Sequence, residues 1–231
     1  MIEAILFDKD GTLFDFYGTW GVVTEEAALL AAEGDAARAA DMLLRSGKDP
    51  KTGRFAPGSV IASGSNREIA ALWAEILGRT DVEELTAAVQ AHFLARQPHV
   101  MQPVVDFADF FARLRRRGYR LGIATMDSEV AAHQAMDKFG VRGSLDFICG
   151  FDTGHGTKPG GGMVEAFARA LALPASAIAV VGDSPHDMHM ARAGGAGRAV
   201  GVLTGVSSSE ALVEAGAHVV LQSIADLEAA L

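Results

Sequence analysis

The sequence predicts an α/β protein: a doubly wound parallel sheet with a helical domain inserted after its first strand. Short apolar runs of strand length recur along the chain, and from residue 104 onward a helix-length segment separates each run from the next. Near-continuous apolar strands that alternate with helices are typical of a parallel sheet covered on both faces. One long helical stretch, residues 16–100, interrupts this alternation.

Six runs have the composition of buried strands. They are residues 4–7, 121–124, 147–149, 178–181, 199–203 and 219–221. The helices expected around them are 104–117, 128–139, 162–171, 187–193, 208–215 and 224–231. Gly118 and Gly140 follow two of these helices, where glycine adopts the left-handed conformation that ends a helix.

The insertion shows helical spacing in three segments, 24–44, 67–77 and 82–95, and no strand-like run of comparable strength. Pro98 and Pro103 stand near the point where the alternating pattern resumes. We therefore expect a core of residues 1–15 and 101–231, and a hinge-bounded helical cap of residues 16–100. Extra helices packed rigidly on the core are the alternative.

Composition limits the classes of partner. The net charge of -9 argues against nucleic acid, since phosphate backbones are bound by surplus Lys and Arg. A single cysteine, Cys149, excludes an intrachain disulfide and fits a reducing, cytoplasmic location. No segment approaches the ~20 apolar residues of a membrane span, and the N-terminus lacks a signal-peptide pattern. Oligomeric state stays open.

Two carboxylates, Asp8 and Asp10, follow the first strand directly. Ligands of open α/β sheets collect beyond the carboxyl ends of the strands. A calcium loop that began at Asp8 would need Gly at its sixth position and Glu at its twelfth, where this chain has Leu13 and Thr19. An ordinary Asp/Gly turn remains open from this segment alone.

Polar residues follow three further strands: Thr125, Lys158, and Asp183 with Asp187. If the first and fourth strands are neighbours, Asp183 lies beside Asp8 and Asp10. Crowded carboxylates repel one another unless a cation joins them, and Mg²⁺ binds one or two carboxylates together with substrate phosphate. Helix capping explains one such Asp, but not the same arrangement at two strand ends.

In this order, the four motifs resemble the haloacid dehalogenase superfamily, specifically its phosphoglycolate phosphatase-like phosphatases. The motifs are residues 8–12, Thr125, Lys158-Pro159, and Gly182-Asp183 with Asp187. The insertion also falls where this family places its cap. The resemblance implies a Mg²⁺-dependent phosphatase that hydrolyses a small phosphate monoester through an aspartyl-phosphate, with 2-phosphoglycolate as a candidate substrate.

The resemblance implies a role for each motif residue. Asp8 would be the nucleophile, and Asp10 would protonate the leaving oxygen and then deprotonate water. Mg²⁺ would be bound by Asp8, the Asp10 carbonyl and Asp183, with Asp187 in support. The remaining residues expected to hold or neutralise the phosphoryl group are Lys9, Gly11, Thr125, Met126 and Lys158.

The sequence departs from the family pattern in three places. Lys9 stands where relatives often have an apolar residue, and Met126-Asp127 is not the commonest pair after the Thr. Residues 160–162 are all Gly, where relatives often carry a second Pro. We expect these departures to affect substrate fit more than reaction class. His155 and His186 are more typical of loop or cap residues than of catalytic bases.

Residues 45–67 carry five cations and one anion, in a chain of net charge -9. This segment is the best candidate for contacts to the non-reacting part of an anionic substrate, and we select Arg54 and Lys51 within it. A solvated loop is the alternative. At the level of function, a phosphomutase of the same family and a non-catalytic phospho-ligand-binding module are the alternatives. Asp10 argues against dehalogenase or phosphonate chemistry.

Overall fold

The computed structural model describes all 231 residues, and the chain divides into two compact units. The core unit comprises Met1–Asp15 and Pro103–Leu231, and the cap unit comprises Phe16–Gln102. The boundaries expected from the sequence differ from these by two residues at the second junction.

The core unit contains one sheet of six parallel strands in the order β3-β2-β1-β4-β5-β6. The strands are β1 (Ala4–Phe7), β2 (Arg120–Ala124), β3 (Phe147–Cys149), β4 (Ile178–Gly182), β5 (Arg198–Val202) and β6 (Val219–Leu221). The order of the strands reverses at β1, which pairs with both β2 and β4. This is the topological switch point where open α/β sheets bind ligands. The predicted fold class is confirmed.

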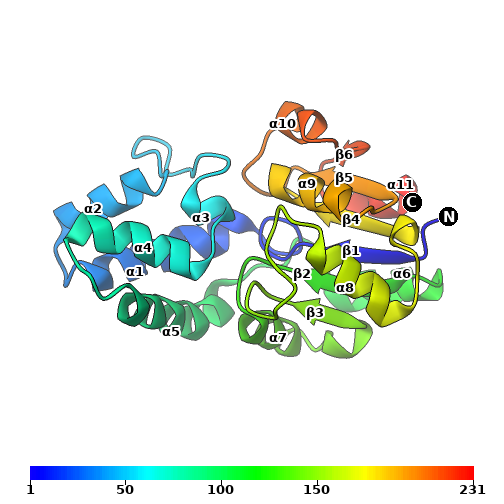
Figure 1. Cartoon of the computed structure of the whole chain (residues 1–231), viewed down its shortest axis with the longest axis horizontal. Helices are drawn as coiled ribbons and strands as arrows, with labels where there is room; N and C mark the ends of the chain where they lie inside the picture. The colour runs from blue at the N-terminus through cyan, green and yellow to red at the C-terminus, as the bar shows by residue number, and fades with distance from the viewer. The chain divides into compact units, whose positions relative to one another are not determined.

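Helices cover both faces of this sheet (Figure 1). They are α6 (Phe107–Arg116), α7 (Glu129–Lys138), α8 (Gly162–Leu171), α9 (Pro185–Ala193), α10 (Ser209–Glu214) and α11 (Leu227–Ala230). The helix expected at 104–117 begins later, because the Asp106 side chain accepts a hydrogen bond from Asp109 N and caps it. The segment expected as a helix at 224–231 opens with a 3₁₀ turn, Ile224–Asp226.

The alternation of side chains along β1 divides the core between the two faces. Leu6 belongs to a buried cluster with Phe167 of α8 and Met188 of α9. Phe7 points to the other face, where its ring lies 6.0 Å from the rings of both Phe110 and Phe111 of α6. Because both faces bury apolar residues, the strands are apolar at consecutive positions, as the sequence predicted.

The regular elements of the cap unit are helices, and residues 46–59 between α2 and α3 are non-helical. A π-helical turn, Tyr17–Gly21, leads into α1 (Val22–Ala31), α2 (Ala36–Arg45), α3 (Val60–Ser63), α4 (Asn66–Leu77) and α5 (Val82–Val100). Trp73 of α4 is fully buried, and its indole N–H donates a 2.9 Å hydrogen bond to Ser46 Oγ. A buried indole N–H needs such a partner, so this bond fixes α4 against the end of α2.

Three details of the cap differ from the sequence prediction. The stretch 24–44 is two helices, because Gly34 has a left-handed φ of 85° and the Asp35 side chain caps α2. Residues 60–63, for which the sequence predicted no helix, form α3. Helix α5 runs five residues beyond the expected end at 95 and includes Pro98, which stands within its last turn.

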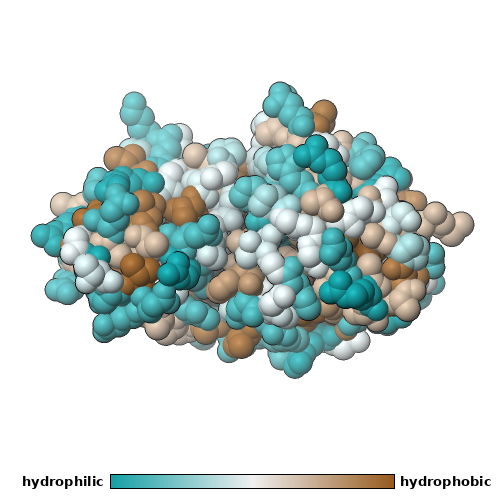
Figure 2. Space-filling view, viewed as in Figure 1, coloured by the Kyte–Doolittle hydropathy of each residue, from teal (hydrophilic) through white to brown (hydrophobic).

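The visible surface of each unit is mostly hydrophilic or neutral, with hydrophobic side chains scattered over it (Figure 2). The exposed large apolar residues come from both units; they are Met1, Val22, Leu29, Leu30, Leu44, Val130 and Val213. No helix combines the length and apolar character that a membrane crossing requires.

The aromatic cluster on the α6 face generates a stability prediction. Phe110 is completely buried against Phe7, so Phe110→Ala leaves a cavity and should lower the free energy of unfolding by about 3–5 kcal/mol. Urea denaturation followed by far-UV circular dichroism measures it. Val213→Ala removes an exposed side chain of the same unit and should change stability by less than about 0.5 kcal/mol. Equal losses in the two variants would contradict the packing described.

Candidate active site

Buried acidic side chains gather where β1 and β4 end. Asp8 follows β1 and Asp183 follows β4, and the pairing of Phe7 with Val181 places the two loops side by side. One oxygen from each of Asp8, Asp183 and Asp187 lies within 4.8 Å of the others. All three residues are buried, and the pairing of β1 with β4, which the sequence had left as a condition, produces a concentrated negative site.

A buried lysine enters this site from the loop after β3. Lys158 Nζ forms an ion pair with Asp8 Oδ1 and another, at 2.6 Å, with Asp187 Oδ1. Burial alone would lower the pKa of Lys158, but the two carboxylates outweigh this effect and the pKa is raised. Lys158 therefore stays charged and holds two of the three carboxylates in place.

Asp187 has a second partner that limits its role. Its Oδ2 accepts hydrogen bonds from the Ser184 hydroxyl, at 2.7 Å, and from Ser184 N, at 3.1 Å. In return, Ser184 Oγ accepts from Asp187 N, which completes a capping box at the start of α9. Both oxygens of Asp187 are thus engaged by protein, which suits a supporting position better than direct contact with a metal.

The loop after β5 also reaches the site, and the sequence analysis missed it. Val206 N donates to Asp183 Oδ2 at 3.1 Å, and Thr204 Oγ1 donates to the Gly11 carbonyl at 2.6 Å. A Cβ at Gly205 would lie 1.7 Å from Asp183 Oδ2, so this position requires glycine. Thr204-Gly205 directly after an apolar run, followed closely by Ser207 and Ser208, was the signal that could have identified this loop.

Gly11 is a second position where glycine is required. Its φ is 82°, in the left-handed region, and a Cβ there would lie 2.6 Å from the Asp183 carboxyl group. The turn that follows Asp10 can therefore approach Asp183 closely. The main chain at Gly11, which the sequence predicted to bind phosphate, therefore lies beside the Asp183 carboxyl group.

Burial and mutual repulsion shift the titration of the central carboxyls. Burial raises the pKa of Asp8 to about 7; Asp187 and Asp10 add to the rise, while Lys158 opposes it. Burial likewise raises the pKa of Asp183 well above its usual range, with further contributions from Asp8 and Asp187. A shared cation would relieve both the desolvation and the repulsion.

The donor set fits a hard divalent cation. Five carboxylates lie at these loops but only two ammonium groups face them; the carboxylates are Asp8, Asp10, Asp127, Asp183 and Asp187, and the ammonium groups are Lys9 and Lys158. All of the candidate ligands are oxygens, which hard divalent cations prefer. Asp8 and Asp183, with the Asp10 carbonyl predicted from the sequence, could therefore hold the ion.

Thr125 lies at the end of β2, as predicted. It is buried; its Oγ1 accepts from Asp127 N at 3.0 Å, and its own N–H donates to the Cys149 carbonyl at 3.0 Å.

Cys149 is a packed strand thiol, and burial raises its pKa to about 12. The His155 ring stacks on Phe147, with centroids 6.0 Å apart, in keeping with a loop role.

The five cations of residues 45–67 in the cap differ in whether they have a carboxylate partner. Three of them pair with carboxylates of the cap unit: Arg45 with Glu75, Lys48 with Glu25, and Arg67 with Glu83. Lys51 and Arg54 form no ion pair, and the Arg54 guanidinium lies 4.5 Å from the centroid of the Tyr17 ring. The two residues selected from the sequence are thus the two whose charge stays unneutralised.

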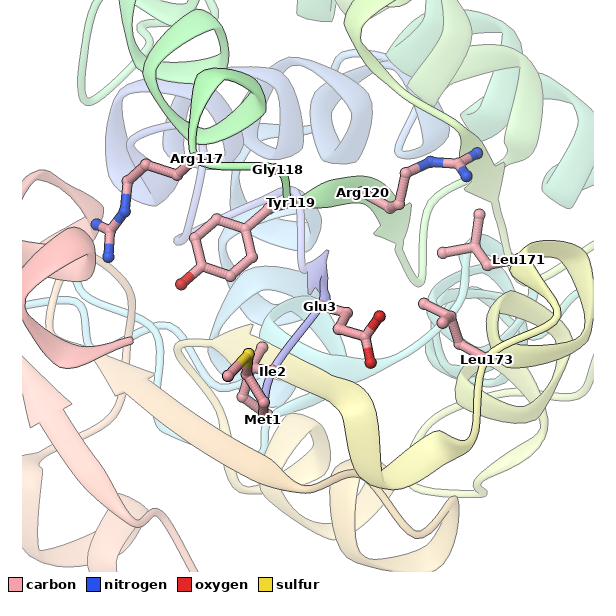
Figure 3. Close-up of a pocket in the computed structure, with 9 residues that line it drawn as sticks. All are labelled: Met1, Ile2, Glu3, Arg117, Gly118, Tyr119, Arg120, Leu171 and Leu173. Carbon is pink, nitrogen blue, oxygen red and sulfur yellow. The ribbon is translucent and has the colours of Figure 1, made fainter.

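A cavity of about 370 Å³ lies at the opposite end of the strands, where residues at the starts of β1 and β2, with Leu171 and Leu173, line it (Figure 3). The side chains of Arg117 and Arg120 point away from each other in this view. Each is also paired, Arg120 with Asp146 at 2.8 Å and Arg117 with Glu228 at 3.5 Å. The cavity therefore offers no convergent charge for an anion.

Comparison with known proteins identifies the family of this chain. A sequence model of the family described as "Hydrolase: haloacid dehalogenase-like hydrolase" matches residues 2–195. The chain belongs to the haloacid dehalogenase-like hydrolases. The resemblance found in the sequence is confirmed.

This hydrolase has curated relatives. It is 28% identical over 236 residues to Phosphoglycolate phosphatase of Rhodospirillum rubrum, an alignment that covers 98% of this chain and 90% of that protein. It is 30% identical over 152 residues to Probable phosphatase IndB of Dickeya dadantii. That second alignment covers 63% of this chain, and the chain spans 65% of that relative's length.

Solved structures show the same fold. The haloacid dehalogenase-like family protein SP0104 of Streptococcus pneumoniae superposes on this hydrolase with a TM-score of 0.74 at 18% identity. The superposition covers 99% of this chain and 98% of that one.

The shifted carboxyls predict how metal acts on stability. Because folding raises the pKa of Asp8 from 3.8 to about 7, its contribution to stability is complete below pH 4 and is lost as the pH rises through 7. Mg²⁺ should restore that loss, so it should raise the Tm at pH 8 and have little effect at pH 5. Thermal denaturation with and without MgCl₂ at the two pH values measures this.

The matched variant is Asp183→Asn, which removes one of the repelling charges. Without metal at pH 8 its Tm should exceed that of the wild type, and MgCl₂ should no longer raise it. The same Mg²⁺-induced gain in both proteins would exclude Asp183 as a ligand.

Proposed function

We propose that this hydrolase is a Mg²⁺-dependent phosphatase that acts on a small phosphate monoester through an aspartyl-phosphate on Asp8. The observation that carries the proposal is the environment of Asp8: a buried carboxylate at the switch point of the sheet, paired with Lys158 and adjacent to Asp183. Phosphoryl transfer depends mainly on positioning and charge stabilisation, and this arrangement supplies both.

In the first step, Asp8 attacks phosphorus while the bond from phosphorus to the ester oxygen breaks. Asp10 donates its proton to the departing oxygen, which leaves as an alcohol. Lys158 neutralises negative charge on Asp8 and on the transferring group, and Thr125 with nearby main-chain N–H groups orients the phosphoryl oxygens. Mg²⁺ bound by Asp8, Asp183 and the Asp10 carbonyl would neutralise charge on the phosphoryl group.

In the second step, water attacks the phosphorus of the aspartyl-phosphate. Asp10, now a carboxylate, accepts a proton from that water, and the bond between phosphorus and Asp8 breaks. Inorganic phosphate leaves, and both carboxyls return to their starting state. One residue thus serves as acid and then as base.

The name of the Rhodospirillum rubrum relative supports 2-phosphoglycolate as the first substrate to test. That compound carries a second anion, the carboxylate, which Arg54 and Lys51 of the cap could recognise. A phosphomutase would instead return the phosphoryl group to a phosphorylated sugar, and a binding module would retain the ester intact. Product analysis distinguishes the three.

The nucleophile is tested by Asp8→Asn. Turnover of 4-nitrophenyl phosphate with Mg²⁺ should fall about 10³-fold or more, because the amide cannot form the covalent intermediate. Mass spectrometry of acid-quenched wild type should locate the phosphoryl group on Asp8. Asp226→Asn, a change at an exposed Asp of the same unit, should retain full activity. Appreciable turnover by Asp8→Asn would remove Asp8 as the nucleophile.

Recognition by the cap is tested with Arg54→Ala. The kcat/KM for 2-phosphoglycolate should fall about tenfold, which corresponds to ~1.4 kcal/mol, because one charged contact is lost. The kcat/KM for 4-nitrophenyl phosphate, which lacks a second anion, should change little. Arg67→Ala serves as the control, since Arg67 is already paired with Glu83. Unchanged kinetics of Arg54→Ala with both esters would count against that residue.

A further inference from the structure

A second buried lysine lies beside the proposed acid and base. Lys9 is fully buried. Its Nζ contacts both oxygens of the Asp10 carboxylate, Oδ2 at 2.7 Å and Oδ1 at 2.9 Å. An ammonium that contacts both oxygens restricts rotation of the carboxylate about its side-chain bonds. Lys9 is therefore placed to determine where the Asp10 carboxylate lies.

Lys9 is itself anchored by Asp127, in the loop after β2. Asp127 Oδ2 meets Lys9 Nζ at 3.1 Å as an ion pair. Its Oδ1 accepts from Ser128 N at 2.8 Å, and its own N–H donates to Thr125 Oγ1 at 3.0 Å. Asp127 is thus tied to the main chain that carries the predicted phosphate-binding Thr125. Because Lys9 contacts both Asp127 and Asp10, that same loop also helps to fix the position of Asp10.

The local chain makes this contact possible. The Lys9 carbonyl accepts from Leu13 N at 2.9 Å and from Phe14 N at 3.1 Å, so the chain reverses directly after Asp10. In a regular strand, adjacent side chains point to opposite faces. The tight turn instead brings the Lys9 and Asp10 side chains together. Asp127 and Asp10 together outweigh the effect of burial and raise the pKa of Lys9, so its charge persists.

We propose that Lys9, anchored by Asp127, is a positioning residue that holds the Asp10 carboxyl group in line with the ester oxygen. This inference rests on the proposed function, in which Asp10 protonates the leaving group. It assigns Lys9 a role different from the phosphate binding predicted from the sequence. Loss of the Lys9 ammonium removes the contact to both oxygens that restricts the Asp10 carboxylate, and general acid catalysis weakens.

The test compares two esters that differ in how much they need the acid. Phenyl phosphate releases a strongly basic phenolate that must be protonated, whereas 4-nitrophenyl phosphate releases a stable anion. Because kcat/KM includes steps only through the first irreversible one, it reports the phosphorylation of Asp8. General acid catalysis contributes roughly 10²–10⁴-fold, and a misplaced acid forfeits part of it.

Lys9→Met should therefore lower kcat/KM for phenyl phosphate at least about tenfold, and for 4-nitrophenyl phosphate by less than about twofold. Lys138→Met, at an exposed position of α7, is the matched control and should treat both esters as the wild type does. A purely structural role for Lys9 predicts equal losses with the two esters. Equal losses, or no loss, would overturn the proposal.

A double variant separates stability from positioning. Lys9→Met alone leaves the buried Asp127 carboxylate and the half-buried Asp10 carboxylate without their cation, which destabilises the fold. Lys9→Met with Asp127→Asn removes one charge of each sign and should regain Tm, yet it should retain the selective loss with phenyl phosphate. Wild-type kinetics in the folded double variant would overturn the proposal. If neither variant folds, Asp127→Asn is measured alone. A larger loss of kcat/KM with phenyl phosphate than with 4-nitrophenyl phosphate would support the proposal, and equal losses would overturn it.

The outcome also separates this proposal from the function on which it rests. If Asp8→Asn remains active, the aspartyl-phosphate mechanism itself fails. If Asp8→Asn is inactive but Lys9→Met affects the two esters equally, only the positioning role of Lys9 fails.

Discussion

The neutralisation of buried carboxylates is the constraint on which the rest of this structure depends. Carboxylates that share a water-poor space raise each other's pKa and destabilise the fold unless cations lie among them. Lys158 joins Asp8 to Asp187, and Lys9 joins Asp10 to Asp127. Both lysines come from loops at the carboxyl ends of strands, so the sheet must be assembled before the charges balance. The negative charge that remains around Asp183 is what a divalent cation would neutralise.

The loops around this site are shaped so that polar groups approach within contact distance. Glycine at position 11 and at position 205 lets two loops close against Asp183, and a Cβ at Gly182 would lie 2.2 Å from the Asp187 carboxyl group. Asp187 caps α9 and holds Lys158 at the same time. One side chain, Asp187, thus caps a helix and holds an active-site lysine, which links the start of α9 to the chemistry proposed for Asp8.

Much of the fold could be predicted from the sequence because its signals are local. The residues of β1, β3 and β6 coincide with the predicted apolar runs. The agreement is best explained for β1, since a strand buried on both faces is apolar throughout. The predictions failed at two single residues: Gly34 divides a helical stretch into α1 and α2, whereas α5 continues through Pro98, which stands in its last turn. The loop of Thr204 to Val206 was missed because its contacts to Gly11 and Asp183 span a large separation along the chain.

The sequence by itself determined the parallel sheet, the family, and the set of acids and lysines that follow the strands, because apolar periodicity and motif order need no knowledge of contacts. Lys9 and Asp127 were visible only as two unrelated departures from the family pattern. Their pairing was decided by the tertiary structure, since 118 positions of chain separate them and only the adjacency of β1 and β2 brings their loops together. The same holds for Lys158: an ammonium's partners depend on which strand ends are neighbours, and strand order is a property of the folded sheet.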